Sequence, residues 1–361
     1  YLRIYIHIYN ITDSVLFQKH FIWHLFFYLS GHRNVVRRMY TYPIFAYDCT
    51  FVVRHSPVTY HKCTATNEHK KSSKKFGGYM KKAAVFNDLS GFGKCSLTAA
   101  IPVLSAQGVQ CCPMASAVLT NQTGYEYHKC TDLTAMINDY IDNWQKNNAH
   151  FDGIYSGFMT GSKQIELFMD FLNVFYEENT MLLVDPVMGD DGRTYGIYSA
   201  ALLDGMKALS RKADVITPNL TEACLLADYD IEKVYSDTRK DVLLPLATEI
   251  SEKLRCLSGK NQDVIITGIK CRDDKSPFIY NLVTTANGTT THRSHFFDVS
   301  FSGTGDLFAS VICGSRLNGF STEEAAERAG KFLYDSIADT MNDDTAPNDG
   351  VNFEKFLREL M

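Results

Sequence analysis

The stretch "TMLLVDPVMGDDG", residues 180–192, contains the pattern that decides the fold. A short apolar run from Met181 to Val184 ends at an acid, Asp185, and leads into a glycine-containing turn. Uninterrupted apolar runs of this length are typical of strands buried on both faces, as in parallel sheets. Helical patterns lie on either side, at 162–179 and 201–213. This order of elements indicates an α/β protein.

The same alternation extends from about residue 81 to near the end of the chain. Further strand patterns lie at 81–86, 109–120, 151–159, 214–220 and 262–270, a hairpin pattern at 277–294, and helical patterns at 131–147, 241–259, 305–317 and 322–340. We therefore expect a mainly parallel central sheet with helices on both faces. Ligands of such folds bind beyond the carboxyl ends of the strands, so the residues that follow each apolar run are the candidate site.

The charge divides the chain into two compositions. Residues 1–79 carry 11 Lys and Arg against 3 Asp and Glu, a net charge of +8, whereas residues 80–361 carry 25 against 38, a net of −13. The aromatic residues of the first segment follow neither a helical nor a strand period, and its longest apolar run, near Ile22–Leu29, is too short to span a bilayer. We expect residues 1–79 to be upstream sequence translated in frame or a disordered extension, and Met80 to begin the folded domain.

Several functional classes lack their motifs in this chain. The ten cysteines include no CxxC pair and no Cys/His set at zinc spacing, and GxxxxGK[ST] is absent, which excludes a P-loop. No Ser-His-Asp or Cys-His arrangement is visible. Because residues 80–361 contain no transmembrane or secretion signal, we expect a cytoplasmic protein that binds neither nucleic acid nor membrane.

The segment "FSGTGDLFASV", residues 301–311, places an acid at the start of a helical pattern. The small residues Gly303, Thr304 and Gly305 allow close backbone approach, and the free N–H groups of a helix N-terminus bind anions. Asp306 would repel a bound phosphate, so it is better suited to take a proton from a hydroxyl that attacks the phosphate. The alternative is that Asp306 only caps the helix.

Two other polar stretches follow strand patterns. Asp185, Asp190 and Asp191 come after a buried strand, where carboxylates are suited to hold Mg²⁺ directly or through water; a solvated turn is the alternative. In "TPNLTEA", Asn219 and Glu222 are three residues apart at the start of a helix. Glu222 either orients a metal-bound water or completes a capping box with Asn219.

The order of the motifs is more specific than any one of them. Asn-Asp-x-Ser-Gly-x-Gly is followed by Asn-x-Thr-Gly, Asp-Pro-Val-Met-Gly-Asp, Thr-Pro-Asn-x-x-Glu and Gly-Thr-Gly-Asp. This succession resembles the ribokinase-like superfamily, and within it the pyridoxal/pyridoxamine kinases, over about residues 81–340. The resemblance implies a three-layer α/β sandwich for residues 80–361. It also implies transfer of the ATP γ-phosphoryl group to the 5′-hydroxyl of pyridoxal, pyridoxamine or pyridoxine, in salvage of pyridoxal 5′-phosphate.

The resemblance also implies roles for individual residues. Asp306 matches the family's catalytic base, and the amides of Gly303, Thr304 and Gly305 match its anion hole. The positions that match the family's ligand contacts are Asp88, Thr123 and Phe158 for the pyridine ring, Asp190, Thr217, Asn219, Glu222 and Thr267 for the nucleotide phosphates, Phe297 and Val299 for the adenine, and Asp185 and Glu222 for Mg²⁺ through water. A homodimer is implied, and a monovalent cation remains an open cofactor.

The chain departs from the pyridoxal kinases at two places. Many of them have Gln-Ser-His where this chain has Asn87-Asp88-Leu89, and an acid there is similar to the hydroxymethylpyrimidine kinases, which share fold and chemistry. The usual Asn-His-Thr appears as Asn121-Gln122-Thr123. A hydroxymethylpyrimidine kinase is therefore the alternative of the same class, and a catalytically silent binder of B6 vitamers is the alternative of another class.

Overall fold

The computed structural model describes residues 79–272 and 278–361, and the expectation for residues 1–79 lies outside them except at Tyr79. The described residues form a nine-stranded sheet in the order β11-β10-β9-β8-β5-β4-β1-β2-β3. Its strands are β1 (Lys82–Ser90), β2 (Gln110–Leu119), β3 (Cys130–Asp132), β4 (Gly153–Ser156), β5 (Met181–Val184), β8 (Val215–Ile216), β9 (Asp263–Cys271), β10 (Phe278–Thr285) and β11 (Gly288–His295). The six central strands, from β2 to β9, pair in parallel, and both edges are antiparallel.

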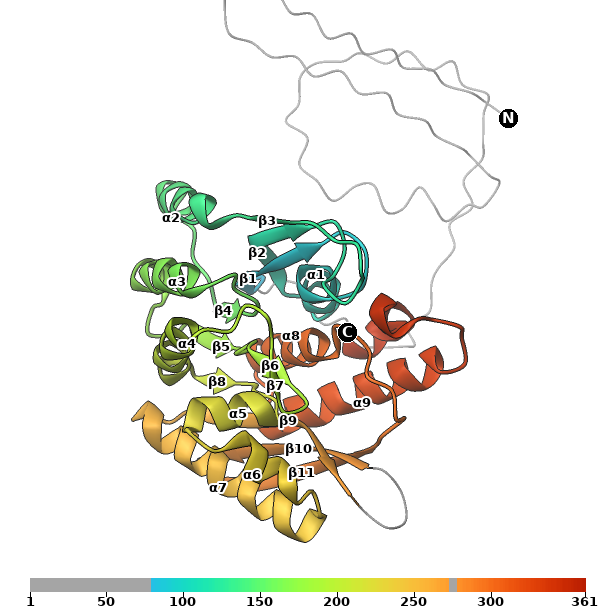
Figure 1. Ribbon diagram of the computed structural model, residues 1–361. Helices are drawn as coiled ribbons and strands as arrows, with labels where there is room; N and C mark the ends of the chain where they lie inside the picture. Colours follow the sequence, from blue (N-terminus) through green and yellow to red (C-terminus); the bar gives the residue numbers. More distant parts are fainter. Residues whose placement is uncertain (1–78, 273–277) are drawn as a thin grey trace, which may run out of the picture. The chain divides into compact units, whose positions relative to one another are not determined.

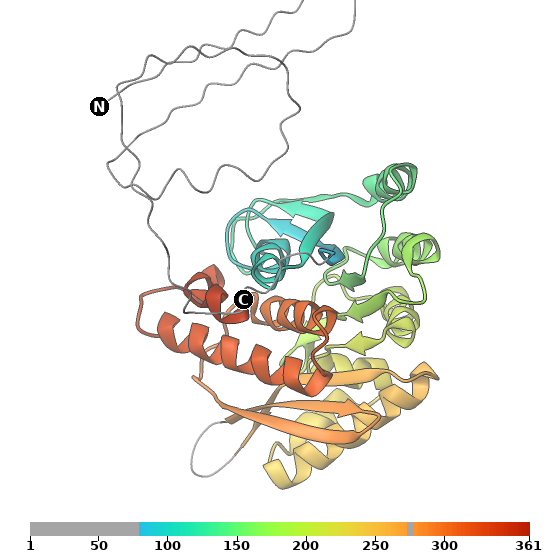
Figure 2. The same cartoon turned by 180° about the vertical axis from the view of Figure 1, so that it is seen from behind.

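Helices cover both faces of the sheet, which makes the three layers expected from the sequence (Figure 1). One layer comprises α2 (Ile137–Lys146), α3 (Ser162–Phe175), α4 (Ala200–Lys212), α5 (Leu220–Ala227), α6 (Ile231–Ser236) and α7 (Lys240–Ser258). The other comprises α1 (Ser96–Ala106), α8 (Thr304–Leu317), α9 (Thr322–Thr340) and a short 3₁₀ segment, η4 (Phe353–Leu360). The reverse view shows α8 and α9 side by side over the sheet (Figure 2).

The alternation of side chains along the central strands produces two separate cores. In β1, Ala84 and Phe86 face the α3 layer, whereas Ala83 and Val85 face the α1 and α8 layer. All four are almost completely buried, which explains why the strand reads as an uninterrupted apolar run. At 25 cal/mol per Å², about 1.5–3 kcal/mol is gained for each large apolar side chain buried, so both faces stabilise the sheet.

Two local predictions from the sequence are wrong. The helical pattern at 131–147 begins only at Ile137, because Cys130–Asp132 pairs with β2 as the edge strand β3 and a 3₁₀ turn, η2 (Thr134–Met136), follows. The hairpin pattern at 277–294 predicts a turn at Asn287-Gly288, and the turn is shifted by one residue. Thr285 pairs with Gly288, so the two turn residues are Ala286 and Asn287, and Gly288, at φ +120°, opens β11.

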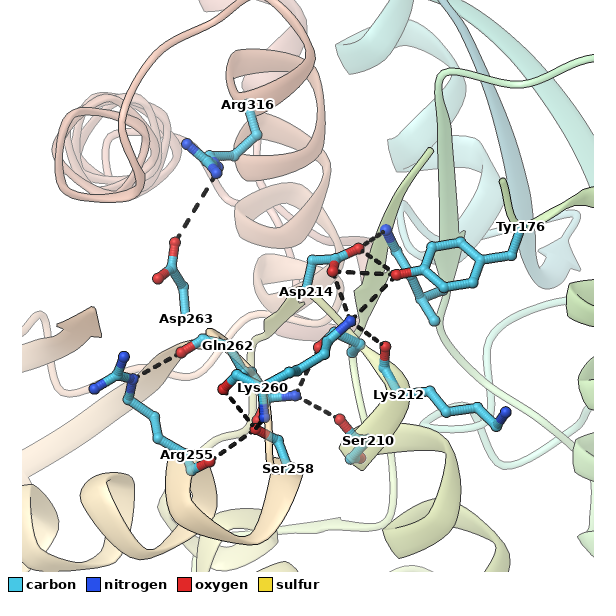
Figure 3. A network of polar contacts seen from close by, with 12 residues as sticks. Tyr176, Ser210, Lys212, Asp214, Arg255, Ser258, Lys260, Gln262, Asp263 and Arg316 are labelled. Carbon is cyan, nitrogen blue, oxygen red and sulfur yellow. Dashed lines mark hydrogen bonds and ion pairs between the residues drawn. The ribbon is translucent and has the colours of Figure 1, made fainter. Parts of the chain in front are cut away.

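A polar network fastens the amino ends of the strands, on the edge of the sheet opposite the carboxyl ends (Figure 3). Asp214, just before β8, accepts hydrogen bonds from Leu182 N at 2.7 Å and from Tyr176 OH at 2.9 Å. The Nζ of Lys260 lies 2.6 Å from the Asp214 carboxylate, and Gln262 donates to the Ser210 and Ala213 carbonyls. The network joins the ends of α3 and α4 to β5 and β9. It therefore stabilises the positions of these helices and strands relative to one another.

In the described ranges, every helix is too short or too polar to cross a bilayer.

Candidate active site

The turn before α8 has the conformation that the Gly-Thr-Gly-Asp motif requires. Gly303 is the N-cap at φ +79°, and a Cβ built on it would lie 1.9 Å from the Lys94 carbonyl oxygen. In the described residues no side chain caps this end of α8, since the Thr304 hydroxyl donates instead to the Phe301 carbonyl at 3.1 Å. Gly305 is exposed, with nothing within 4 Å of a built Cβ. The N–H groups of Thr304, Gly305 and Asp306 have no hydrogen-bond partner among the described residues, so they are available to an anion.

Asp306 lies in the first turn of α8, half-buried, and is held by two neighbouring elements. Asn87 Nδ2 donates to its Oδ1 at 3.0 Å, and the backbone of Ser96 lies close enough to stabilise the charged form. Burial and the nearby Asp88 carboxylate raise the pKa of Asp306 to about 6, against the lowering effect of Asn87 and of the Ser96 backbone. At neutral pH the carboxylate is ionised, yet its proton affinity is far above that of an ordinary aspartate.

Asp88, at the end of β1, lies next to Asp306 but points into the protein. Its exposed fraction is 6%, and its oxygens accept hydrogen bonds from Ser96 Oγ at 2.5 Å and Ser90 Oγ at 2.9 Å. Burial raises the pKa of Asp88. Ser96 therefore bonds Asp88 through its hydroxyl and acts on Asp306 through its backbone, and it has φ +50°, a conformation that non-glycine residues rarely adopt. Strain of this kind is typical of functional sites.

The other two residues predicted for the ring pocket, Phe158 and Thr123, differ in burial and in their contacts with the Asp88–Asp306 region. Phe158, half-buried after β4, donates its backbone N–H to Asn87 Oδ1 at 2.9 Å, so it is joined to the Asp88–Asp306 region. Thr123 is exposed, in the loop that follows β2. That loop is fastened through its neighbours, because Gln122 donates to the Asn348 carbonyl at 3.2 Å.

The residues predicted for the phosphates and for Mg²⁺ lie after β5, after β8 and within β9. Thr217 Oγ1 donates to Asp185 Oδ1 at 3.2 Å, and Asn219 pairs with Thr267 as an isolated bridge. The capping interpretation of Glu222 is confirmed, since its carboxylate accepts from Asn219 N at 2.9 Å while its own N–H donates to Asn219 Oδ1. The other Glu222 oxygen accepts from Met188 N at 3.0 Å. The structure thus brings Asp185, Thr217, Asn219, Glu222 and Thr267 together.

The remaining residues predicted for the nucleotide are Asp190, Phe297 and Val299. Asp190, in the short hairpin of β6 (Gly189–Asp190) and β7 (Arg193–Thr194), is exposed and accepts from the next N–H at 2.8 Å. The half-buried Phe297 ring lies 5.6 Å from that of Tyr334 on α9. Val299 packs against the core below α8. For Phe297 and Val299, the described contacts are with α9 and this core rather than with Asp185 and Glu222.

Two buried acids of the candidate site are suited to a divalent cation. Asp185 and Glu222 are 8% and 4% exposed, and burial raises the pKa of each. The charge of Asp306 raises the pKa of Asp185 further, and the charge of Asp185 raises that of Glu222. Their hydrogen-bond partners in the described chain are a hydroxyl and backbone N–H groups. The described residues contain no group of three or more His, Cys, Asp or Glu in metal-binding geometry. The pair therefore fits Mg²⁺ completed by water and phosphate oxygens rather than a closed protein cage.

The sequence reasoning missed a brace formed by residues 346–350, which include the short 3₁₀ turn η3 (Pro347–Asp349). The Pro347 and Asp349 carbonyls accept from Ser302 N at 3.0 Å and Lys94 N at 3.1 Å. Asn348 contacts the loop after β2, and Tyr125 OH donates to Asp349. "APNDG" signals a turn, but nothing in its composition indicates that the turn joins three loops of the site.

The sequence and the fold were compared with those of known proteins. The sequence profile of the phosphomethylpyrimidine kinase family matches residues 93–349. Crystal structures of a candidate phosphomethylpyrimidine kinase from Bacteroides thetaiotaomicron, one of them with pyridoxal, are 35% identical, with TM-scores of 0.70 and 0.71 over 79% and 78% of this chain and 96% of that protein. Pyridoxal kinase from Lactobacillus plantarum is 25% identical, with a TM-score of 0.68 over 78% of this chain and 97% of that one.

A yeast protein is similar to this chain in sequence. A candidate pyridoxal kinase of Saccharomyces cerevisiae is 29% identical over 219 residues, which cover 56% of this chain and 64% of the yeast protein, less than two thirds of its length. The expected three-layer fold is confirmed by the sheet order and by the Bacteroides structures. The chain belongs to the phosphomethylpyrimidine kinase family, within the ribokinase-like superfamily.

Proposed function

We propose that this protein phosphorylates the 5′-hydroxyl of a B6 vitamer (pyridoxal, pyridoxamine or pyridoxine) with ATP. One observation carries the proposal: a carboxylate with a pKa of about 6 lies in the first turn of an uncapped helix whose first N–H groups have no hydrogen-bond partner among the described residues, beside the open space at Gly305. A base must be ionised at neutral pH and still have appreciable proton affinity, and Asp306 meets both conditions. A helix cap alone needs neither the raised pKa nor the open approach at Gly305.

The proposed reaction uses the two halves of the Gly-Thr-Gly-Asp turn for different tasks. Asp306 takes the proton of the 5′-hydroxyl as that oxygen forms a bond to the γ-phosphorus of ATP. The bond from the γ-phosphorus to the β–γ bridging oxygen breaks, and ADP leaves. The N–H groups of Gly303, Thr304 and Gly305 stabilise the charge on the transferring phosphoryl group because they are already oriented toward it.

The ring of the vitamer is assigned to the region between β1 and β4. Phe158 offers an aromatic face there, and Thr123 lies on the loop held by the 346–350 brace. Asp88 contributes negative charge for a ring nitrogen or hydroxyl. Its carboxylate is turned toward Ser90 and Ser96, so contact with the ring needs one of those hydroxyls as an intermediary or a change of rotamer.

We assign ATP to the neighbouring half of the sheet edge. Asp190, Thr217, Asn219, Glu222 and Thr267 flank the phosphates, and Phe297 and Val299 flank the adenine.

Asp185 and Glu222 would hold Mg²⁺ through water, and the ion when bound would neutralise charge on the phosphates. A hydrogen bond from Thr217 holds Asp185, and the reciprocal hydrogen bonds between Asn219 and Glu222 hold the second pair. The assignment of a homodimer rests on the family resemblance alone, and the cytoplasmic location stays the expectation drawn from the sequence.

A hydroxymethylpyrimidine kinase is the second candidate, favoured by the acid at position 88 and by the matching family profile. The Bacteroides relative, crystallised with pyridoxal at 35% identity, supports the B6 vitamer instead. A silent binder has no use for a base of raised pKa, which weighs against it.

The three candidates are separated by measuring ADP release and the phosphorylated product with pyridoxal, pyridoxamine, pyridoxine and hydroxymethylpyrimidine, each with ATP and Mg²⁺. We expect kcat/KM to be highest for a B6 vitamer. A higher value for hydroxymethylpyrimidine would transfer the assignment to the second candidate. Binding of pyridoxal without product would favour the silent binder.

A further inference from the structure

Asn87 is a completely buried polar residue near the end of β1, and its side chain makes contacts that core packing does not explain. Its Nδ2 donates to Asp306 Oδ1 at 3.0 Å. Its Oδ1 accepts from the backbone N–H groups of Asp88 at 3.0 Å and Phe158 at 2.9 Å. One amide therefore joins the proposed base to the ends of β1 and β4, where the ring of the vitamer is assigned.

The orientation of this amide is fixed by its partners. The oxygen receives two backbone N–H donors, so the NH₂ group has to be the end that faces the Asp306 carboxylate. The chain also reserves space for it. A Cβ at Gly157 would lie 2.4 Å from Asn87 Nδ2, so the residue before Phe158 has to be glycine while the amide occupies this position.

Burial and the nearby Asp88 carboxylate both disfavour the negative charge of Asp306. Among the described side chains, Asn87 is the one that donates a hydrogen bond to Asp306. Without Asn87, the Asp306 carboxylate would have no side-chain donor to offset burial and the repulsion from Asp88.

We propose that Asn87 is the positioning residue of the base: it holds the Asp306 carboxylate in one orientation relative to the ring pocket. The inference rests on the proposed function, in which Asp306 takes the proton of the substrate hydroxyl. Asn87 touches neither substrate nor phosphate in this account, and acts through Asp306. A loss of 0.5 Å or 10–20° in the orientation of a catalytic group is enough to lower the rate, so the hydrogen bond has a kinetic consequence.

Two substitutions separate positioning from packing. Asn87→Asp keeps the size of the side chain and an oxygen for the Asp88 and Phe158 N–H groups, but it places an acceptor against Asp306. Asn87→Ala removes all three contacts and leaves two buried N–H groups unpaired. We expect Asn87→Asp to lower kcat for pyridoxal by about 10- to 100-fold, the loss expected for one hydrogen bond to a charged group, with the KM for ATP within about twofold.

The decisive measurement is a double-mutant cycle with Asp306→Asn. If Asn87 acts through the base, Asn87→Asp has less than about a twofold further effect on kcat in the Asp306→Asn background. An equal loss in both backgrounds, or a wild-type kcat in the single variant, overturns the proposal. Asn147→Asp is the matched control, because Asn147 is an exposed residue after α2 that bonds the Asn143 carbonyl, before the amino end of β4. It should keep wild-type kinetics.

A crystal structure of Asn87→Ala separates this inference from the proposed function. We expect the Asp306 carboxylate to leave its present position in that variant. An unmoved carboxylate contradicts positioning even if the protein is a kinase, whereas a moved carboxylate in a protein that phosphorylates none of the substrates contradicts only the proposed function. Melting temperatures of all variants show whether each one is folded at the assay temperature.

Discussion

The two glycines of the Gly-Thr-Gly-Asp motif should respond in opposite ways to the same substitution. A Cβ on Gly303 would lie 1.9 Å from the Lys94 carbonyl oxygen, whereas a Cβ on Gly305 would meet nothing within 4 Å. The Lys94 carbonyl has little freedom to move, since the N–H groups on either side of it are bonded: Lys94 N donates to Asp349 O at 3.1 Å and Cys95 N donates to Thr98 Oγ1 at 3.2 Å. Gly303 therefore serves the fold, and Gly305 leaves space for the phosphate.

The magnitudes follow from backbone conformation and packing. Alanine at the positive φ of Gly303 costs about 1–2 kcal/mol, and relieving the overlap with Lys94 adds about 1–3 kcal/mol. Together these correspond to a fall in melting temperature of roughly 5–15 °C. Gly305 lies in the first turn of α8, where alanine is favoured over glycine by about 0.5–1 kcal/mol, so Gly305→Ala should melt at the same temperature or slightly higher.

The assay is thermal unfolding and steady-state kinetics of both variants beside the wild-type chain. We expect Gly305→Ala to be stable but to lose about tenfold or more in kcat, because its methyl group occupies the approach to the first N–H groups of α8. Gly303→Ala should lose stability. Wild-type kcat in Gly305→Ala would refute the phosphate approach, and a wild-type melting temperature in Gly303→Ala would refute the packing argument.

Three further outcomes are expected. Because burial raises the pKa of Asp306 from 3.8 to about 6, the base is ionised above that pH and protonated below it; kcat/KM should fall as the pH drops through about 6, and a profile flat to pH 4.5 would contradict the assignment. Asp88→Ala should raise the KM for pyridoxal by about 10-fold or more and that for ATP much less, and equal effects on both would reject a substrate-pocket role. A chain that begins at Met80 should melt cooperatively and keep full kcat, since the described sheet begins with β1 at Lys82; a loss of cooperative melting would show that the preceding residues belong to the folded structure.

Much of the fold was predictable because it depends on short-range patterns. The buried run from Met181 to Val184 is a central strand paired in parallel on both sides, as its composition indicated. The error at Cys130–Asp132 has a physical cause. Three exposed residues pair with the end of β2 through backbone groups, and their side chains carry no strand signal that a helical pattern would not also allow.

The sequence predicted the acidic residues of the candidate site but not the contacts that hold them in place. Asp306, Asp185 and Glu222 were found because each follows a strand or opens a helix, and parallel strands bring such positions to one edge. The amide of Asn87, the unusual φ of Ser96 and the brace at 346–350 depend on contacts between residues more than 200 positions apart or on tertiary packing. Local sequence patterns do not indicate contacts between distant residues. The structure is therefore needed to show which side chains hold the proposed base.

The most direct test of the account is the turnover of Asp306→Asn with pyridoxal and ATP, measured as pyridoxal 5′-phosphate formed per enzyme. Asn is nearly isosteric with Asp but cannot accept the proton of the hydroxyl. We predict that kcat falls by about 10²–10⁴-fold while pyridoxal still binds and the melting temperature is not lowered. A variant that retains more than about a tenth of the wild-type kcat would contradict the assignment of Asp306 as the base and leave it as a residue of the helix terminus.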